Sequence, residues 1–295
     1  MKIKYEVENS ESGFLLLANA DGKTVGRAKA LTDGYDWAMI YDIEADDEEI
    51  EKGLVQNLVS KLEGQEIFTV SALDKLSFYE SLGFRRSKNA FTFFGEDLSL
   101  EQEKELTKSG LYLPIGFQYE TEFEPFAGTF PVGRKSGKKD ITVSYLSEPD
   151  GIDYEQVNAL LEKAFGSKRD IAVTKDTFLH SQYVQYAFEG EKLIGCARAV
   201  SDGNHALILN VAVDPDYQGL HLGWNVVVKL AQQMEGPTIF LNTHPGGVGF
   251  YNRKGFRRNK TAFLYPAHEM PHEIEKGFST PVGYRFPDEY KLFDS

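Results

Sequence analysis

Between residues 209 and 224 the sequence reads Leu209-Asn-Val-Ala-Val-Asp-Pro-Asp-Tyr-Gln-Gly-Leu-His-Leu-Gly-Trp224, and this stretch decides the fold of its half of the chain. Its apolar beginning is typical of a buried strand that ends at Asp214-Pro215, and a helical pattern begins close to the second of two glycines. A helix N-terminus presents unpaired N–H groups and a partial positive charge, so the turn is a candidate anion site. Glycine is also ordinary turn chemistry, so a plain strand–turn–helix connection is the alternative.

The same half carries further strand and helix patterns on either side of this stretch. We expect strands over 141–146, 184–189, 192–200, 206–213, 238–242, 256–265 and 282–286. We expect helices over 153–165, 174–182, 220–234 and 248–253, the first of them capped by Asp153. An antiparallel start followed by alternating strands and helices predicts an α+β fold, in which helices cover both faces of a mixed, mostly antiparallel sheet.

Similar segments occur twice in the chain. The segment Gly83-Phe-Arg-Arg-Ser-Lys-Asn-Ala-Phe91 recurs as Gly255-Phe-Arg-Arg-Asn-Lys-Thr-Ala-Phe263, with seven of nine positions identical. Three more matches keep the same order, and they pair 26–34 with 195–203, 78–79 with 250–251, and 114–117 with 281–284. Because chance similarity does not keep order and spacing, we predict a duplicated domain in which each copy is a complete fold.

The boundary between the two copies follows from composition. The stretch 125–139 is rich in Pro, Gly and Lys and lacks helical periodicity, which is typical of a linker. We therefore expect a first copy over 1–135 and a second copy over 136–295.

Two motifs of the second copy resemble those of the GNAT N-acetyltransferase superfamily. The first is Gln/Arg-x-x-Gly-x-Gly/Ala after a Val-x-Pro strand end, and here Val213-Asp-Pro215 precedes Gln218-Gly-Leu-His-Leu-Gly223. His221 stands where the family usually has its middle glycine, and an imidazole N–H could still donate to a phosphate. The second motif is Phe-Tyr-x-x-x-Gly-Phe, which Gly249-Phe-Tyr-Asn-Arg-Lys-Gly-Phe256 matches.

The resemblance covers roughly 140–265 and, more faintly, 1–95, and it implies two tandem GNAT-like domains and the use of acetyl-CoA. It implies that pantetheine pairs with the strand end like an added strand and that the pyrophosphate lies on the glycine-containing turn. The binding residues that it implies are Val211, Ala212, Val213, Gln218, Gly219, Leu220, His221, Leu222 and Gly223. Family members often hold a CoA-binding asparagine where this sequence has Thr243, and Asn242 is the substitute that we consider.

The resemblance also implies direct transfer, in which a deprotonated amine attacks the thioester and Tyr251 protonates the leaving thiolate. A phenol with a pKa of about 10 is a reasonable proton donor to a thiolate whose conjugate acid has a pKa of about 8.5. The alternative for Tyr251 is a packed aromatic side chain on a helix face.

The base that deprotonates the amine is not evident from the sequence. Asn210 stands where many relatives carry an acid that faces the acceptor, and its neutrality points to another base. The candidates are Asp202, His205 and His244, each of which could equally be a turn residue.

The first copy carries acids where the second carries its glycine-containing turn. Six of the eight residues from Glu44 to Glu51 are acidic, and the counterpart of the turn is Asp46–Gly53. Carboxylates at close range would repel a pyrophosphate. We therefore expect the first copy to keep the fold and to have lost acetyl-CoA, with Tyr79 as a structural residue. It would shape the acceptor pocket of the second copy or stabilise that copy.

Three other patterns favour structural interpretations. His268-Glu-Met-Pro-His272 fits the His-Glu-x-x-His zinc pattern, but Pro271 interrupts the helix that this pattern requires, so no metal site is expected. Cys196 is expected to be a buried small side chain. The repeated pairs Arg85-Arg86 and Arg257-Arg258 could contact the 3′-phosphate of CoA, but their presence in both copies favours a structural role.

Composition sets the wider expectations. The 295 residues suffice for two domains, and a net charge of −13 argues against a nucleic-acid partner. No apolar run approaches the roughly 20 residues that cross a bilayer, and the start lacks a signal-peptide pattern, so no membrane partner is expected. A single cysteine fits a reducing cytoplasm. The oligomeric state stays open.

On this resemblance we expect an acetyl-CoA-dependent N-acetyltransferase whose active site lies in the second copy. The expected acceptor is a primary amine of a small molecule, and the acidic balance favours a cationic one such as a polyamine, an amino sugar or an amino acid derivative. The alternatives are a non-catalytic module that binds acyl-CoA and a protein N-acetyltransferase with an open peptide groove.

Overall fold

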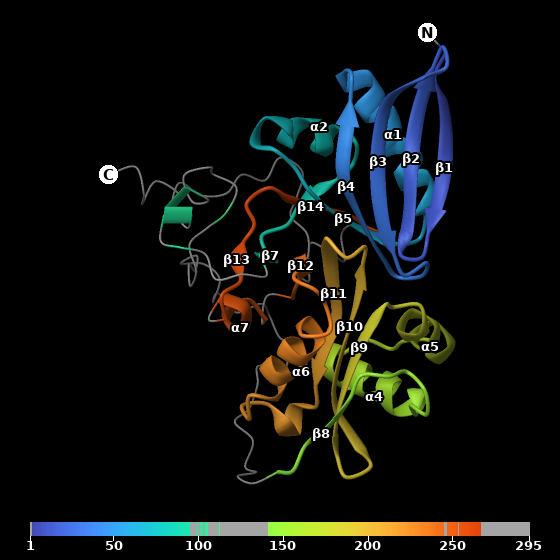
Figure 1. Ribbon diagram of the computed structural model, residues 1–295. Helices are drawn as coiled ribbons and strands as arrows, with labels where there is room; N and C mark the ends of the chain where they lie inside the picture. Colours follow the sequence, from blue (N-terminus) through green and yellow to red (C-terminus); the bar gives the residue numbers. More distant parts are fainter. Residues whose placement is uncertain are drawn as a thin grey trace. The chain divides into compact units, whose positions relative to one another are not determined.

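The computed structural model describes residues 2–94, 99, 101–102, 104–105, 112, 141–244, 247–252 and 254–266 of the chain. It is an α+β structure with two seven-stranded sheets, each mixed and mostly antiparallel, as the sequence predicts (Figure 1). Contacts divide the chain into a first unit of Met1–Phe93, Asp97–Glu124 and Asn242–Ser295 and a second unit of Phe94–Glu96 and Pro125–Leu241. The expected linker, the boundary at 135/136, the strand at 282–286 and the His268–His272 segment lie outside the described residues.

The first sheet has the strand order β1-β2-β3-β4-β5-β14-β6. Its strands are β1 (Lys4–Ser10), β2 (Gly13–Ala20), β3 (Lys23–Thr32), β4 (Trp37–Ala45), β5 (Glu66–Val70), β14 (Ala262–Tyr265) and β6 (Arg85–Arg86). Helix α1 (Glu48–Lys61) follows β4, and a short 3₁₀ turn, Leu73–Lys75, leads into α2 (Leu76–Ser81). The parallel pair β4–β5 is joined through α1, and the other pairings are antiparallel.

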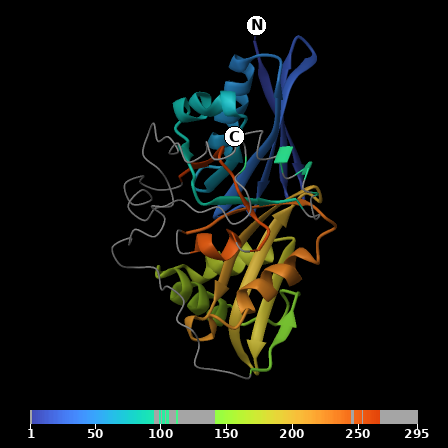
Figure 2. The same ribbon diagram turned by 90° about the vertical axis from the view of Figure 1, so that its left-hand side faces the viewer.

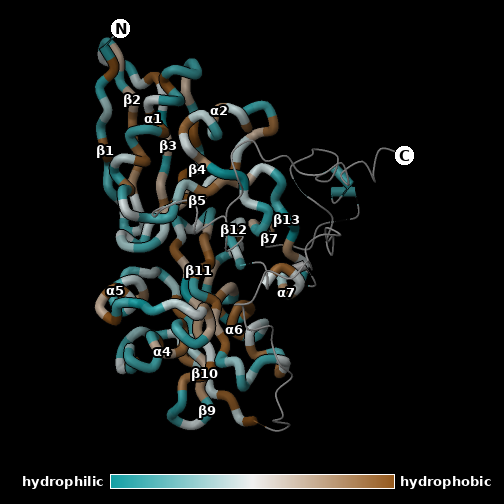
Figure 3. Tube along the Cα trace, turned by 180° about the vertical axis from the view of Figure 1, so that it is seen from behind, coloured by the Kyte–Doolittle hydropathy of each residue, from teal (hydrophilic) through white to brown (hydrophobic). Residues whose placement is uncertain are grey.

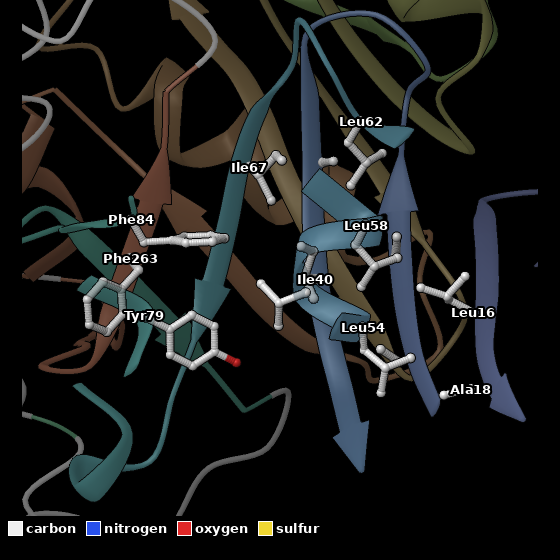
Figure 4. Close-up of a cluster of buried hydrophobic side chains, with 14 of the residues drawn as sticks. Leu16, Ala18, Ile40, Leu54, Leu58, Leu62, Ile67, Tyr79, Phe84 and Phe263 are labelled. Carbon is white, nitrogen blue, oxygen red and sulfur yellow. The ribbon is translucent and has the colours of Figure 1, made fainter. Parts of the chain in front are cut away.

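The core of the first unit lies between α1 and one face of this sheet (Figure 4). Leu54 and Leu58 of the helix pack with Leu16 and Ile40 of the strands, and all four are fully buried. The repeated glycine Gly26 allows this close packing, because a Cβ there would lie only 2.8 Å from the Ile50 side chain and 3.0 Å from that of Leu54. The counterpart Gly195 also lies under a helix of the second unit, where Val226 is 3.4 Å from its Cβ position, which is an ordinary contact distance.

The second sheet has the strand order β13-β7-β12-β11-β10-β9-β8. Its strands are β8 (Ser144–Leu146), β9 (Tyr183–Glu189), β10 (Lys192–Ser201), β11 (His205–Val213), β12 (Thr238–Asn242), β7 (Ala90–Phe93) and β13 (Arg257–Arg258). Helices α4 (Tyr154–Phe165) and α5 (Ile171–Leu179) lie on the face opposite to α6 (Leu222–Ala231), as Figure 2 shows. The hydropathy colouring of Figure 3 marks β11 and α6 as hydrophobic, in agreement with their buried side chains.

Most of the predicted elements of the second copy are confirmed, with two shifted helices. Asp153 caps α4 as predicted and accepts hydrogen bonds from the N–H groups of Glu155 and Gln156. Helix α5 begins three residues earlier than predicted because Asp170 caps it. Helix α6 begins two residues later than predicted, since His221 has a left-handed conformation that cannot continue a helix, and it ends three residues earlier, at Ala231.

The first copy lacks the helix pair that joins β8 to β9 in the second copy. Strands β1 and β2 form a tight hairpin instead. On the sheet face opposite α1, the exposed ion pair Arg27–Glu44 (2.7 Å) spans β3 and β4. The matching cross-strand pair of the second copy is Cys196–Ala212, which is buried against α4. The difference in residue type between the copies therefore follows from the presence or absence of the covering helices.

The last strands of the two copies are exchanged between the sheets. Strand β14 belongs to the second copy in sequence, yet it pairs with β5 and β6 of the first sheet. Strand β7 of the first copy lies in the second sheet and pairs with β13. The predicted single strand at 256–265 is thus wrong, because β13 and β14 belong to different sheets, and so is the prediction that each copy is a complete fold.

The hydrogen bonds at the exchange are reciprocal. The Ser71 N–H donates to the Thr261 carbonyl (3.1 Å), and the Thr243 N–H donates to the Asn89 carbonyl (3.1 Å). These residues are counterparts of each other in the two copies. The repeated sequence therefore forms the same crossover twice.

The repeated arginines of this segment stabilise the exchange. The buried Arg86 guanidinium donates to the Lys260 carbonyl and lies 5.4 Å from the Phe263 ring centre. Its counterpart Arg258 donates to the Lys88 carbonyl and lies 5.8 Å from the Phe91 ring centre. Each arginine thus binds the strand of the other copy, which supports the structural interpretation of this motif over contact with CoA. No helix within the described residues is long and apolar enough to span a membrane.

Candidate active site

Strand β11 contains a bulge at Asn210. Cys196 of β10 pairs with Ala212, but Arg198 pairs with Leu209, so β11 has one extra residue between these partners. Asn210 takes a left-handed conformation (φ 52°) there, and its side-chain oxygen accepts a hydrogen bond from the Nε of the buried Arg198. The bulge thus places a polar side chain and a buried guanidinium together in the middle of the sheet.

Beyond this bulge, β11 is no longer paired with its parallel neighbour. The ladder between β11 and β12 covers only His205–Leu207, opposite Thr238–Phe240. Within the described residues, the backbone of Val211–Val213 therefore has no ladder partner on the β12 side. An extended chain with amide groups can pair with such an edge as an added strand.

The turn from β11 to α6 runs from Asp214 to His221. It opens with the 3₁₀ turn Pro215–Tyr217 and continues through Gly219, which has a left-handed conformation (φ 85°). His221 is the N-cap of α6, and its side chain is exposed and makes no capping hydrogen bond. By contrast, α1, α4 and α5 are each capped by an aspartate side chain. The first N–H groups of α6 are therefore left to a ligand or water.

The left-handed backbone of His221 explains why the GNAT signature has glycine at this position. Its φ of 59° is strained for a residue with a Cβ and free for glycine. Histidine is among the residues that tolerate the conformation best. The departure from the motif thus preserves the turn.

The first copy has no comparable turn. Strand β4 ends at Ala45 and α1 begins at Glu48, so only two residues separate them. The Asp47 side chain occupies the helix start by accepting from the Ile50 N–H (2.9 Å). Three glutamates, Glu48, Glu49 and Glu51, lie in the first helical turn. This helix N-terminus is already capped and negatively charged, so it does not fit a pyrophosphate.

Tyr251 lies on α7 (Val248–Asn252) in the first unit and is buried. Its ring centre is 5.3 Å from that of Phe256 and 5.8 Å from that of Phe91 of the exchanged strand. Tyr79 is packed in the same way, with Phe84 and the exchanged Phe263 each at 5.5 Å. Burial raises the pKa of both phenols above the ordinary value, so both stay protonated at neutral pH.

The remaining candidates from the sequence, Asn242, Asp202 and His244, differ in their contacts and burial. The side-chain oxygen of Asn242 accepts from the Ser87 hydroxyl (2.8 Å), which involves this residue in the strand exchange. Asp202 accepts from the N–H groups of Asn204 (2.9 Å) and His205 (2.7 Å), which is a turn role. His244 is largely buried, and burial lowers the pKa of its imidazole, which is therefore neutral at physiological pH.

The division into units separates these candidates. The second unit holds the bulge, the 211–213 strand end, the 218–223 turn, and Asp202 with His205. Asp202 lies in the turn before β11 and His205 is the first residue of β11, and five residues at about 3.3 Å each put His205 roughly 16 Å from Asn210. The first unit holds Asn242, His244 and Tyr251.

Two features of this region have no signal in the sequence, namely the burial of Arg198 and the ion pairs of Asp214. Asp214 accepts from Lys163 of α4 (2.6 Å) and pairs with Lys192 of β10 (2.9 Å). Both lysines are far from Asp214 in the sequence, and neither stands in a motif. Only the fold brings them to the start of the turn.

Comparisons with known proteins agree with these features. A model of the acetyltransferase (GNAT) family matches residues 154–256. The chain is 31% identical over 164 residues to the uncharacterized N-acetyltransferase ycf52 of Porphyra purpurea, covering 52% of this chain and 92% of that protein. It is 32% identical over 170 residues to the histone acetyltransferase TAP1 of Glycine max, covering 50% of this chain and 73% of that protein.

Among solved structures, similar folds include a tandem GNAT protein from the clavulanic acid biosynthesis pathway. That match has 14% sequence identity and a TM-score of 0.42, and it covers 87% of this chain and 83% of that one. A GCN5-related N-acetyltransferase from Kribbella flavida matches with 13% identity and a TM-score of 0.43, covering 88% of each chain.

Proposed function

The chain belongs to the acetyltransferase (GNAT) family and is an N-acetyltransferase, and we propose that it transfers the acetyl group of acetyl-CoA to a primary amine of a small molecule. The active site of this proposal lies in the second copy. The observation that carries it is the turn from Asp214 to His221, which leaves the N-terminus of α6 without a side-chain cap. Family members typically use acetyl-CoA, and this turn fits its pyrophosphate.

The second copy supplies the binding groups in this proposal. The N–H groups at the start of α6 and the Gln218–Gly223 backbone hold the pyrophosphate, because both offer donors and positive potential. The edge of β11 at Val211–Val213 pairs with the amides of pantetheine. Acetyl-CoA itself supplies an activated thioester. No matching role is assigned to the first copy, whose α1 carries a capped and acidic N-terminus.

Proton transfer is assigned to Tyr251 and His244 in this proposal. The phenol of Tyr251 is protonated at neutral pH and so holds a proton for the leaving thiolate, and burial, which raises its pKa, opposes the transfer. The lowered pKa of His244 leaves a neutral imidazole that can accept a proton from the acceptor ammonium, directly or through water. The assignment of Tyr251 depends on the sequence motif, because the packing of its ring is shared with Tyr79.

The acceptor class is proposed from charge. A net charge of −13 favours a cationic small molecule, such as a polyamine, an amino sugar or an amino acid derivative. A protein amine is the second candidate, because one relative is named a histone acetyltransferase. The cytoplasm is the proposed location, on the evidence of a single cysteine.

Release of free CoA in the presence of an amine panel tests this function. The panel contains small primary amines and lysine peptides, and Gly223→Glu serves as the control that blocks the turn. We expect at least one small amine to accelerate CoA release by the wild type and not by the control. Acceleration by peptides alone would favour the protein acceptor. Binding of acetyl-CoA without any acceleration would favour the non-catalytic alternative.

A further inference from the structure

The carboxylate of Asp214 is held by two lysines at the start of the α6 turn. Only 5% of its side chain is exposed, and it pairs with Lys163 Nζ at 2.6 Å and Lys192 Nζ at 2.9 Å. It also accepts from the Asp216 N–H (3.0 Å). Lys163 comes from α4 and Lys192 from the first position of β10, so two elements hold the residue at which the turn begins.

The residues after Asp214 are attached to the same groups. Lys163 Nζ also pairs with Asp216 (3.0 Å), and Lys192 Nζ lies 4.7 Å from the ring centre of Tyr217. The Tyr217 hydroxyl donates to Glu189 of β9 (2.5 Å). The first part of the turn is thereby tied to α4, β9 and β10. The Gln218–Gly223 segment continues directly from this fixed part.

These ion pairs differ from ordinary surface pairs because the carboxylate is buried. Burial opposes ionisation of Asp214, but the hydrogen bonds from Lys163, the Asp216 backbone and Lys192 outweigh it, and they hold the pKa of Asp214 below its usual value. The carboxylate is therefore charged at neutral pH. Removing one partner of a buried pair has a larger effect than removing one of an exposed pair.

The first copy provides an internal comparison. Asp46 occupies the matching position, since its N–H donates to Val25 (3.0 Å) as that of Asp214 donates to Ile194 (2.9 Å). Among the ion pairs of the described residues, none involves Asp46, and the first copy has no helix equivalent to α4. Within the described part of the chain, the lysine-held aspartate thus occurs only in the copy that has the long turn.

We propose that Asp214, held by Lys163 and Lys192, is the positioning residue of the pyrophosphate turn and sets the affinity of the protein for acetyl-CoA. This inference rests on the proposed function. The three side chains act through the turn backbone and do not contact acetyl-CoA. Their role predicts an effect on binding and not on the chemical step.

The variant Asp214→Asn separates positioning from simple electrostatics. It removes a negative charge near a polyanionic ligand, so a direct charge effect would strengthen binding. Loss of the two lysine contacts would instead loosen the turn. We expect the Kd for acetyl-CoA to rise about tenfold in Asp214→Asn, with kcat at saturating acetyl-CoA within about twofold of the wild type.

Lys163→Gln tests the same contact from the helix side, and Lys175→Gln is its matched control. Lys163 is 44% exposed, so its replacement should leave the fold intact, as thermal unfolding can verify. Lys175 is an exposed lysine of α5, so Lys175→Gln also removes a positive charge from the second unit. We expect weaker acetyl-CoA binding for Lys163→Gln than for Lys175→Gln, and no further loss when Lys163→Gln is combined with Asp214→Asn.

The outcomes distinguish this inference from the function on which it rests. If the wild type does not bind acetyl-CoA, the proposed function fails. If the wild type binds and folded Asp214→Asn binds equally or more tightly, only the positioning role is overturned. The positioning role is also overturned if Lys163→Gln weakens binding no more than Lys175→Gln does. This comparison can be made even if Asp214→Asn does not fold.

Discussion

At the scale of single residues, Tyr251 is the side chain whose role the packing leaves open. Its ring contacts are the same in kind as those of Tyr79, because each tyrosine packs against a phenylalanine of the exchanged strand. Yet only Tyr251 belongs to the copy in which the helix after the turn, α6, has no side-chain cap. The role of proton donor requires the tyrosine hydroxyl, whereas a packing role requires only the ring.

The matched variants Tyr251→Phe and Tyr79→Phe test this difference. We expect Tyr251→Phe to lower kcat about 10- to 100-fold, because it removes the proton donor while keeping the ring. Tyr79→Phe should leave kcat unchanged. Steady-state rates and thermal unfolding would be measured for both variants. Equal rates for the two would mean that Tyr251 is a packing residue.

His221 gives a second prediction at this scale, because a left-handed residue is sensitive to its Cβ substituents. The conformation costs about 1–2 kcal/mol for an ordinary L-residue and nothing for glycine. We expect His221→Val to lower the free energy of unfolding by about 1 kcal/mol, since β-branched residues tolerate this region least. His221→Gly should match the wild type or exceed it. Urea unfolding measures both, and a His221→Val variant as stable as His221→Gly would contradict the strained turn.

At the scale of elements, the exchanged strands are the part of the fold that the sequence could not predict. The segments 83–91 and 255–263 are nearly identical, so each last strand suits either sheet equally well by its own pattern. The helices and hairpins, in contrast, follow from local periodicity and caps such as Asp153. The candidate turn could be located from the sequence because its residues are contiguous, and its role in binding stays a prediction. The two lysines that pair with Asp214 could not be predicted, because only the fold brings α4 and β10 close to this residue.

The exchange predicts where a core mutation in β14 acts. Phe263 is fully buried and packs in the first core, beside Tyr79 and Phe84 (Figure 4). Phe263→Ala should lower the free energy of unfolding by about 3–5 kcal/mol. Hydrogen exchange should become faster in β5 of the first sheet, and Leu73→Ala, at an exposed site, serves as the control. Faster exchange in β12 with β5 unchanged would contradict the assignment of β14 to the first sheet.

At the scale of the whole molecule, the two copies share a sheet topology but differ in their covering helices and in the turn that follows the central strand. The second copy has the covering helices α4 and α5, the bulge at Asn210 and a long turn with an uncapped helix. The first copy retains a bulge, where Asp42 has a φ of 48°, but it has lost the helix pair and the turn. Because its last strand completes the other sheet, it remains necessary to the fold. We therefore predict one acetyl-CoA site for each chain.

Calorimetric titration of the protein with acetyl-CoA tests the prediction of a single site most directly, because it measures the stoichiometry of binding. Gly223→Glu is the variant to compare, because a carboxylate at the start of α6 would meet the pyrophosphate. We predict one site for each chain in the wild type and none in Gly223→Glu. Two sites for each chain, or a single site that survives Gly223→Glu, would contradict the assignment of acetyl-CoA to the second copy alone.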